Sequence, residues 1–166
     1  PGDLNGRKDR TQARRQTLAD LLRRSAARLP AKPAVICGAA HYTYAEFHAL
    51  TERLAAGLAR AGVAKGDRVA VLARNSHGFA ALRFALARIG AVLVPVNFML
   101  NADEAAYIIR HAGAKLLAVD SGLADLGRAA AAKDTQIQRL LWLPSEQPGE
   151  PIAKASRSLV PTRPSA

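Results

Sequence analysis

One stretch, residues 67–100, restricts the fold of this chain more than any other, because it encodes a strand, a helix and a second strand without a polar interruption. Residues 67–73 (DRVAVLA) have the pattern of a buried strand, and Asn75-Ser76 is expected to cap the helix that follows. Gly90 ends that helix, and residues 92–96 (VLVPV) are apolar again. Two apolar strands joined by a helix predict a right-handed crossover and a parallel sheet covered on both faces.

The rest of the chain continues this alternation. Thr17, Thr43 and Asn101 each stand before a helical pattern, and Thr43 and Asn101 have Glu three residues later, as in a capping box. The side chains of Leu18, Leu21, Leu22 and Leu29 are expected to share one face of the first helix. The pattern predicts an α/β fold with a mostly parallel sheet and helices on both faces. The expected elements are a helix from 17, a hairpin over 34–37 and 41–43, a helix from 43, the strand–helix–strand unit, a helix from 101, a strand over 115–120, an Ala-rich helix over 121–133 and a strand over 139–143.

Three segments are expected along the chain. Residues 1–15 lack any apolar periodicity and are expected to be a disordered leader, residues 16–143 form the α/β subdomain, and residues 144–166 are expected to be an irregular Pro/Ser/Arg-rich tail. No run approaches the ~18 apolar residues that cross a bilayer, and the N-terminus does not have the form of a secretory signal. We therefore expect no membrane span and a cytoplasmic location. A single cysteine, Cys37, excludes an internal disulfide.

The formal net charge of +11 suggests a nucleic-acid partner, but its distribution opposes that interpretation. Residues 1–28 carry +5 and residues 151–166 carry +3, which leaves +3 for the 122 residues between them. No basic stripe interleaved with aromatic residues and no zinc-finger spacing occurs. We therefore interpret the basic ends as solvated segments and expect no nucleic-acid partner.

The glycine patterns that bind nucleotides are missing from the sequence. No G-x-G-x-x-G follows a strand, and although Gly57 and Gly62 have the separation of phosphate-loop glycines, Val63 and Ala64 stand where Lys and Ser/Thr are required. This segment also runs from helix to strand, so it presents carbonyls rather than helix N-terminal amides to an anion. Gly62 is therefore interpreted as the residue that ends a helix.

Ligands bind to sheets of this kind at the loops that lead from strands into helices. Three such loops are predicted, over residues 73–76, 97–101 and 120–122. Arg74 together with Asn75 or Ser76 could contact a phosphate or a carboxylate. The favoured alternative is that Ser76 only caps its helix, since capping alone explains Ser and Asn at this position.

No other residues form a pattern that indicates catalysis. His41, His48, His77 and His111 lack metal-ligand spacing with one another or with cysteine. Ser76 and His77 are adjacent, so their side chains point in different directions and cannot be assigned as a nucleophile and its base. No paired carboxylates stand out. We therefore assign no catalytic, cofactor-binding or metal-binding residue.

Three segments carry a resemblance to a known family. Residues 17–72 contain a Leu-rich helix, a hairpin, a TYAE helix start and a GVAKGDRV strand; residues 75–97 read NSHGFAALRFALARIGAVLVPVN; residues 100–120 read LNADEAAYIIRHAGAKLLAVD. In this order and spacing they resemble the opening of the AMP-forming acyl-CoA synthetases, which belong to the adenylate-forming ligase superfamily. The resemblance implies that the chain is a truncated N-terminal subdomain of an adenylate-forming enzyme.

The resemblance also implies a reaction, in which a carboxylate and Mg-ATP give an acyl-adenylate and pyrophosphate, and coenzyme A then displaces AMP. In the family, a Ser/Thr/Gly-rich loop ending in Pro-Lys-Gly and a Lys of a small C-terminal domain handle the phosphates. Neither motif occurs in these 166 residues. ATP, Mg²⁺ and coenzyme A are therefore expected for the full-length family member, and this segment is expected to bind none of them and to be inactive.

Two classes of function remain. In the first, the chain is the N-terminal part of an acyl-CoA ligase for a carboxylic acid, with a fatty acid as the expected substrate by analogy. In the second, it is a non-catalytic α/β interaction or binding module. From Ile152 the sequence departs from the family into Pro/Ser/Arg-rich residues, which leads us to expect a truncated or frameshifted reading frame. The expected partner is the missing C-terminal remainder or a second copy of the chain, in contact with an unpaired apolar edge or face of the sheet.

Overall fold

The computed structural model describes residues 17–144 and 160–161. The leader expected over 1–15, and all of the expected tail except Pro144 and residues 160–161, lie outside these residues. The elements are α2 (Leu18–Arg28), β1 (Pro33–Cys37), β2 (Ala40–Thr43), α3 (Tyr44–Arg60), β3 (Arg68–Leu72), α4 (His77–Ile89), β4 (Val92–Val96), α5 (Ala102–Ala112), β5 (Leu116–Asp120), the 3-10 helix η1 (Ser121–Leu123), α6 (Ala124–Ala131), β6 (Arg139–Leu143) and β7 (Val160–Pro161).

The main sheet has the strand order β4-β3-β5-β6-β7. Strands β4, β3, β5 and β6 are parallel, and β7 pairs antiparallel with β6. Strands β1 and β2 form a separate antiparallel hairpin, as the sequence predicts. The expected α/β fold with a mostly parallel sheet is confirmed, whereas the pairing of β7 is not predicted by the sequence.

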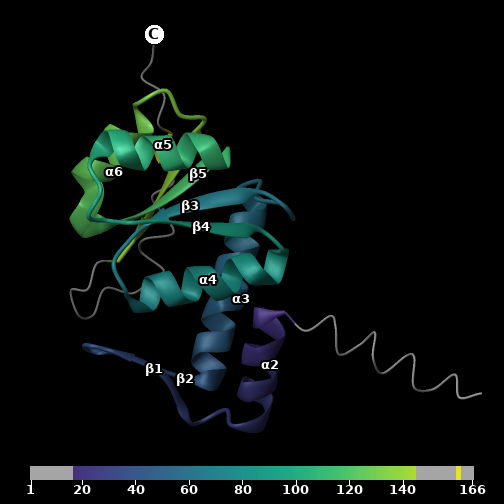
Figure 1. Cartoon of the computed structure of the whole chain (residues 1–166). Helices are drawn as coiled ribbons and strands as arrows, with labels where there is room; N and C mark the ends of the chain where they lie inside the picture. Colours follow the sequence, from purple (N-terminus) through teal and green to yellow (C-terminus); the bar gives the residue numbers. More distant parts are fainter. Residues whose placement is uncertain (1–16, 145–159, 162–166) are drawn as a thin grey trace, which may run out of the picture.

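Helices cover both faces of the sheet, as Figure 1 shows, with α2, α3 and α4 on one side and α5 and α6 on the other. Successive side chains of a strand point to opposite faces, so each inner strand contributes to two cores. The first core, on the side of α3 and α4, contains the strand residues Val69, Val71, Leu116, Ala118, Leu141 and Leu143. The second, on the side of α5 and α6, contains Ala70, Leu72, Leu117, Val119 and Leu140.

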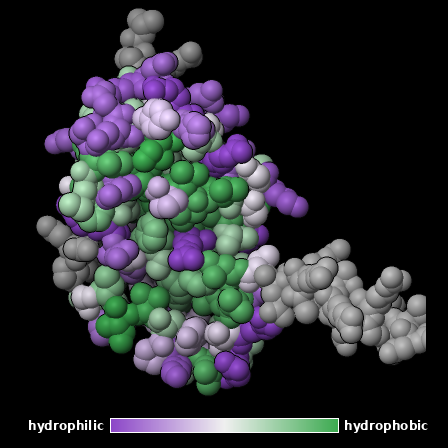
Figure 2. Space-filling model, viewed as in Figure 1, coloured by the Kyte–Doolittle hydropathy of each residue, from purple (hydrophilic) through white to green (hydrophobic). Residues whose placement is uncertain are grey.

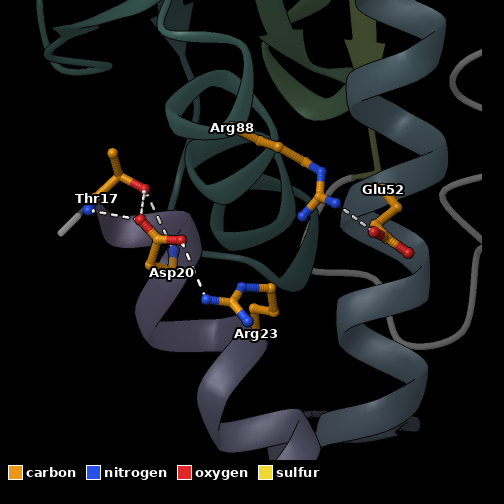
Figure 3. Close-up of polar contacts among 5 residues, drawn as sticks. All are labelled: Thr17, Asp20, Arg23, Glu52 and Arg88. Atoms are coloured by element: carbon orange, nitrogen blue, oxygen red, sulfur yellow. Dashed lines mark hydrogen bonds and ion pairs between the residues drawn. The ribbon is translucent and has the colours of Figure 1, made fainter. Parts of the chain in front are cut away.

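The helices begin where the capping residues predict. The N–H of Thr17 donates to Asp20 Oδ2 over 3.0 Å, and the N–H of Thr43 donates to Glu46 Oε2 over 2.8 Å (Figure 3 shows the first of these). Hydrogen bonds from the backbone N–H and the hydroxyl of Thr17 hold the pKa of Asp20 below its ordinary value. The same two groups of Thr43 lower the pKa of Glu46. These local bonds satisfy amides that a helix N-terminus otherwise leaves unpaired.

Helix α4 is tied to α3 by an ion pair between Arg88 and Glu52, which Figure 3 also shows. The rings of Phe84 and Phe47 meet edge-to-face between the same two helices, with centroids 5.8 Å apart. An exposed ion pair contributes little, so apolar packing carries most of this contact.

Two expectations about burial are corrected by the structure. Leu21 of α2 and Leu29, which follows the helix, are 49% and 39% exposed, so only part of the predicted leucine face packs inward, where Leu22 is buried. Strand β4 is less covered than predicted: Val92 is 47% exposed and Pro95 is also exposed. The physical reason is position, because β4 is an edge strand with β3 as its sole strand neighbour among the described residues. Figure 2 shows the resulting apolar surface between α5 and α4.

Candidate functional site

The topology marks one place where the sheet could bind a ligand. Strand β3 leads into α4 on one face, whereas its neighbour β5 leads through η1 into α6 on the opposite face. The strand order β4-β3-β5-β6 is that of a doubly wound sheet with a switch point between β3 and β5, where the two connecting loops diverge. The candidate site is therefore the carboxyl end of these two strands.

A buried carboxylate lies at this switch point. Asp120 is 1% exposed. Its Oδ1 accepts from the N–H of Gly122 over 2.8 Å, and its Oδ2 accepts from the N–H of Arg74 over 3.4 Å. The guanidinium of Arg74 lies 3.9 Å from the same Oδ2 and stacks over the ring of Phe98, 5.4 Å from the centroid. The Asp120 carboxylate, the Arg74 guanidinium and the Phe98 ring thus join three loops that are distant in sequence.

The helix N-termini around this point are already occupied. Ser76 Oγ accepts from the N–H of Phe79 over 3.1 Å, which confirms the capping interpretation of Ser76. Asn101 Oδ1 accepts from the N–H groups of both Asp103 and Glu104. A Cβ placed on Gly78, in the first turn of α4, would lie 2.9 Å from Pro144, so Pro144 covers that turn. The amides that would bind a phosphate at these helices are capped or covered.

His77 is buried beside these loops but does not act with Ser76. Its side chain is 2% exposed, and neither ring nitrogen has a hydrogen-bond partner among the described residues. Its ring centroid lies 6.1 Å from that of Tyr42. The His77 ring therefore forms no hydrogen bond with Ser76 Oγ.

The chemical capacity of this site is limited. Arg74 retains an outward guanidinium surface that could pair with an anion, since its side chain is 36% exposed. Asn75 is exposed beside it. Within residues 17–144, His, Cys, Asp and Glu side chains form no group of three or more that could hold a metal ion. The cluster therefore organises three loops and offers one cation, without a positioned base or nucleophile.

The sequence alone did not indicate the pairing of Arg74 with Asp120. The two residues are 46 positions apart, and each was considered only as part of its own loop. A signal was present nonetheless, because Asp120 directly continues an apolar strand and a carboxylate so placed requires a partner.

Comparisons with known proteins identify the family. A sequence profile of the AMP-binding enzyme family matches residues 22–163. The fatty acid–[acyl-carrier-protein] ligase ScoC of Streptomyces coeruleorubidus is 40% identical over 102 residues, which cover 61% of this chain and 20% of that protein. The long-chain-fatty-acid–CoA ligase FadD13 of Mycobacterium tuberculosis is 45% identical over 75 residues, which cover 45% of this chain and 15% of that protein. The chain belongs to the AMP-binding enzyme family.

The fold comparison agrees. The crystal structure of the N-terminal domain of FACL13 from Mycobacterium tuberculosis superposes with a TM-score of 0.73 at 30% identity, covering 91% of this chain and 38% of that chain. The matched part of this chain thus spans a fifth or less of the length of these two curated relatives. Among the described residues, none of the helices combines the length and apolar character that a membrane span requires.

Proposed function

We propose that this chain is the structural N-terminal part of an AMP-forming acid–thiol ligase that activates a fatty acid, and that the chain alone does not catalyse the reaction. The complete enzyme would join a carboxylate to coenzyme A at the expense of ATP, releasing AMP and pyrophosphate. The observation that carries this proposal is the combination of a family match over most of the chain with coverage of a fifth or less of its curated relatives. The names of those relatives support a fatty acid as the carboxylate.

The described residues at the switch point do not fit a nucleoside triphosphate. Charge that moves on a triphosphate is stabilised by backbone amides, a lysine and Mg²⁺. At the switch point the helix amides are capped by Ser76 and Asn101 or covered by Pro144, and the Asp120 carboxylate would repel phosphate. We therefore assign ATP and Mg²⁺ to further residues of the complete enzyme, and coenzyme A likewise. A cytoplasmic location belongs to the same proposal, because ATP and coenzyme A are intracellular cosubstrates.

The edge formed by β4 and the following loop supports a docking role. Val92, Phe98 and Met99 expose large apolar side chains there, and Met99 is 81% exposed. The N–H of Val92 donates to the carbonyl of Asp67, just before β3. Backbone groups of a strand alternate between its two sides, so those of Leu93 and Pro95 point away from β3. Pro95 has no N–H to offer an added strand. We propose that the remainder of the ligase packs on this edge through side chains, and that a second copy replaces it when the chain is alone.

An exchange assay tests the proposed function. Radiolabelled pyrophosphate is incubated with ATP, a panel of fatty acids and either the chain alone, the C-terminal remainder of a related ligase alone, or both together. We expect exchange into ATP only in the mixture, because the phosphate-handling groups come from the remainder and the scaffold from this chain. Exchange by the chain alone would contradict the proposal.

The second candidate, a non-catalytic interaction module, is favoured by the exposed apolar edge at Val92 and Met99. The same assay separates the two candidates. A mixture that contains a folded remainder and shows stable association without exchange would support the module and overturn the ligase assignment.

A further inference from the structure

A second concave site lies at the opposite end of the sheet from the switch point. A cavity of about 410 Å³ opens at the amino ends of β3, β5 and β6. Its walls are the C-terminal turn of α3 (61–63), the entry into β3 (66–69), the entry into β5 (113, 115 and 116) and the start of β6 (138–139). The volume is many times the ~30 Å³ that a water molecule occupies in the liquid, so the cavity can admit a small organic or inorganic ligand.

The cavity is lined by more positive than negative charge. Arg68, Lys115 and Arg139 surround it, and Asp67 is the single acid in its lining. Asp67 is already engaged, because its Oδ2 accepts from the N–H of Ala64 over 2.8 Å. The formal charge of the lining is therefore +2, with the acid turned to its own loop.

Two of the three cations have no counter-charge. Val69 of β3 pairs with Leu116 of β5, and these parallel strands lie about 4.8 Å apart. Arg68 and Lys115 each stand one residue before this pair, so they enter the two strands at the same level. Both residues are exposed, and Lys115 stands just before β5, so their mutual repulsion is that of like charges in water. Within residues 17–144, neither Arg68 nor Lys115 forms an ion pair. An anion held between them would relieve this repulsion.

Arg139 has a partner at the C-terminus of a helix, whereas Arg68 and Lys115 do not among the described residues. The guanidinium of Arg139 donates to the carbonyl of Ala61, just after the end of α3. Cations in the last helical turn usually balance the negative end of the helix dipole. Arg60 already stands there in α3, and Arg110 in α5. Arg68 and Lys115 are therefore left for a different partner.

The backbone leaves the cavity open but offers it few donors. Gly62 and Gly113 have φ values of +89° and +65°, and a Cβ on either would meet no atom within 4 Å. Their N–H groups are used, since Gly62 donates to Ala59 O and Gly113 donates to Arg110 O. The helix C-terminal carbonyls at this end oppose an anion, so a ligand would be held by the side-chain charge of the lining alone and not by amides.

We propose that this cavity binds a small molecule carrying a phosphate group, held by Arg68, Lys115 and Arg139. A dianionic phosphate balances a +2 lining, whereas a carboxylate leaves one cation unpaired. The lining contains no aromatic ring on which a base could stack, so the site recognises the phosphate and not a nucleoside. The site is distinct from the switch point and does not depend on the proposed ligase function.

The test is a titration of the full chain with inorganic pyrophosphate, inorganic phosphate and acetate, followed by the backbone amide resonances in NMR. We expect saturable shifts at Gly62, Gly66 and Gly113, with inorganic phosphate and pyrophosphate both binding more tightly than acetate. Arg68→Ala and Lys115→Ala should each weaken pyrophosphate binding about tenfold, as expected for the loss of one charge-assisted contact. Lys115→Arg should retain binding.

The matched control is Lys133→Ala, which removes an exposed cation that pairs with Asp103 outside this cavity. It should leave pyrophosphate affinity unchanged, and thermal melts should show that all four variants remain folded. Shifts spread over the whole basic surface, equal affinity for acetate and pyrophosphate, or full affinity in Arg68→Ala would each overturn the proposal.

Discussion

Strands β4 and β5 have similar sequences and opposite environments. Each is a five-residue parallel strand, and all of these residues except Asp120 are apolar. Every residue of β5 is buried, because β3 and β6 flank it and helices cover both its faces. In β4, Val96 alone is buried. Apolar sequence therefore predicts a strand but not its place in the sheet, and the difference leaves an exposed apolar edge at β4, where we propose that a partner docks.

The largest difference between the two strands should appear when a core side chain is truncated. Leu117 of β5 is fully buried. Leu117→Ala should lower the free energy of unfolding by about 2–5 kcal/mol, through lost transfer energy and a cavity. Val92→Ala on β4 should change it by only about 0.5 kcal/mol. Urea unfolding measures both. Equal losses at the two positions would contradict the assignment of β4 as the exposed edge.

Removal of the charge at the switch point should have the next largest effect. Asp120→Asn weakens the bond from the Gly122 N–H and removes the pairing with Arg74, at an expected cost of about 1–3 kcal/mol. Asp103→Asn is the matched control, because Asp103 is exposed and pairs with Lys133 at the surface. Its cost should be about 0–1 kcal/mol. If denaturant unfolding shows no difference between the two variants, Asp120 does not organise the loops as described.

A smaller loss is expected at a helix cap. Thr43→Ala removes the side-chain acceptor for the Glu46 N–H at the start of α3. The expected cost is about 1 kcal/mol, typical of a lost N-cap. Thr43→Ser keeps the hydroxyl and should stay close to the original stability in the same thermal or urea measurement. A serine variant as unstable as the alanine variant would rule out the cap as the cause.

The smallest effect is a dependence on pH. The pKa of Asp20 and that of Glu46 are lowered because the N–H and hydroxyl of Thr17 and Thr43 donate to the charged carboxylates. A lowered folded-state pKa contributes stability that is fully present above the unfolded-state values, about 3.9 for Asp and 4.3 for Glu, and lost as the pH falls through the folded-state pKa. Glu46→Gln should therefore be less stable than the original chain near neutral pH, and this difference should shrink in acid. A difference that is constant from neutral pH to below about pH 3 would contradict this explanation.

The features that the sequence predicts are those set by neighbouring residues. The caps at Thr17, Thr43, Ser76 and Asn101 depend on partners two or three positions away, so a short motif contains all the information. The order of strands in the sheet cannot be predicted from a short motif, because it depends on which apolar faces pack together. Leu21 shows the same limit: helical spacing places it beside Leu22, but the area of contact with α3 and α4 decides that it stays exposed.

The candidate sites were harder to predict for the same reason. The ligand end of the sheet follows from the strand-to-helix loops, and Arg74 was identified there. Its partner Asp120 ends strand β5 and lies 46 residues further along the chain. The basic cavity is assembled from four separate segments, and Arg68 and Lys115 become neighbours only through the pairing of β3 with β5. Such contacts between distant segments cannot be predicted from the spacing of residues along the chain.

The most direct test of the contrast between the two strands is sedimentation velocity of the chain over a range of concentrations. Val92→Lys places a charge on the β4 edge, and Gln136→Lys adds the same charge at an exposed position before β6 as a control. We predict that the original chain and Gln136→Lys self-associate increasingly with concentration, whereas Val92→Lys remains monomeric. A monomeric original chain at every concentration would contradict the proposal that a partner docks on β4.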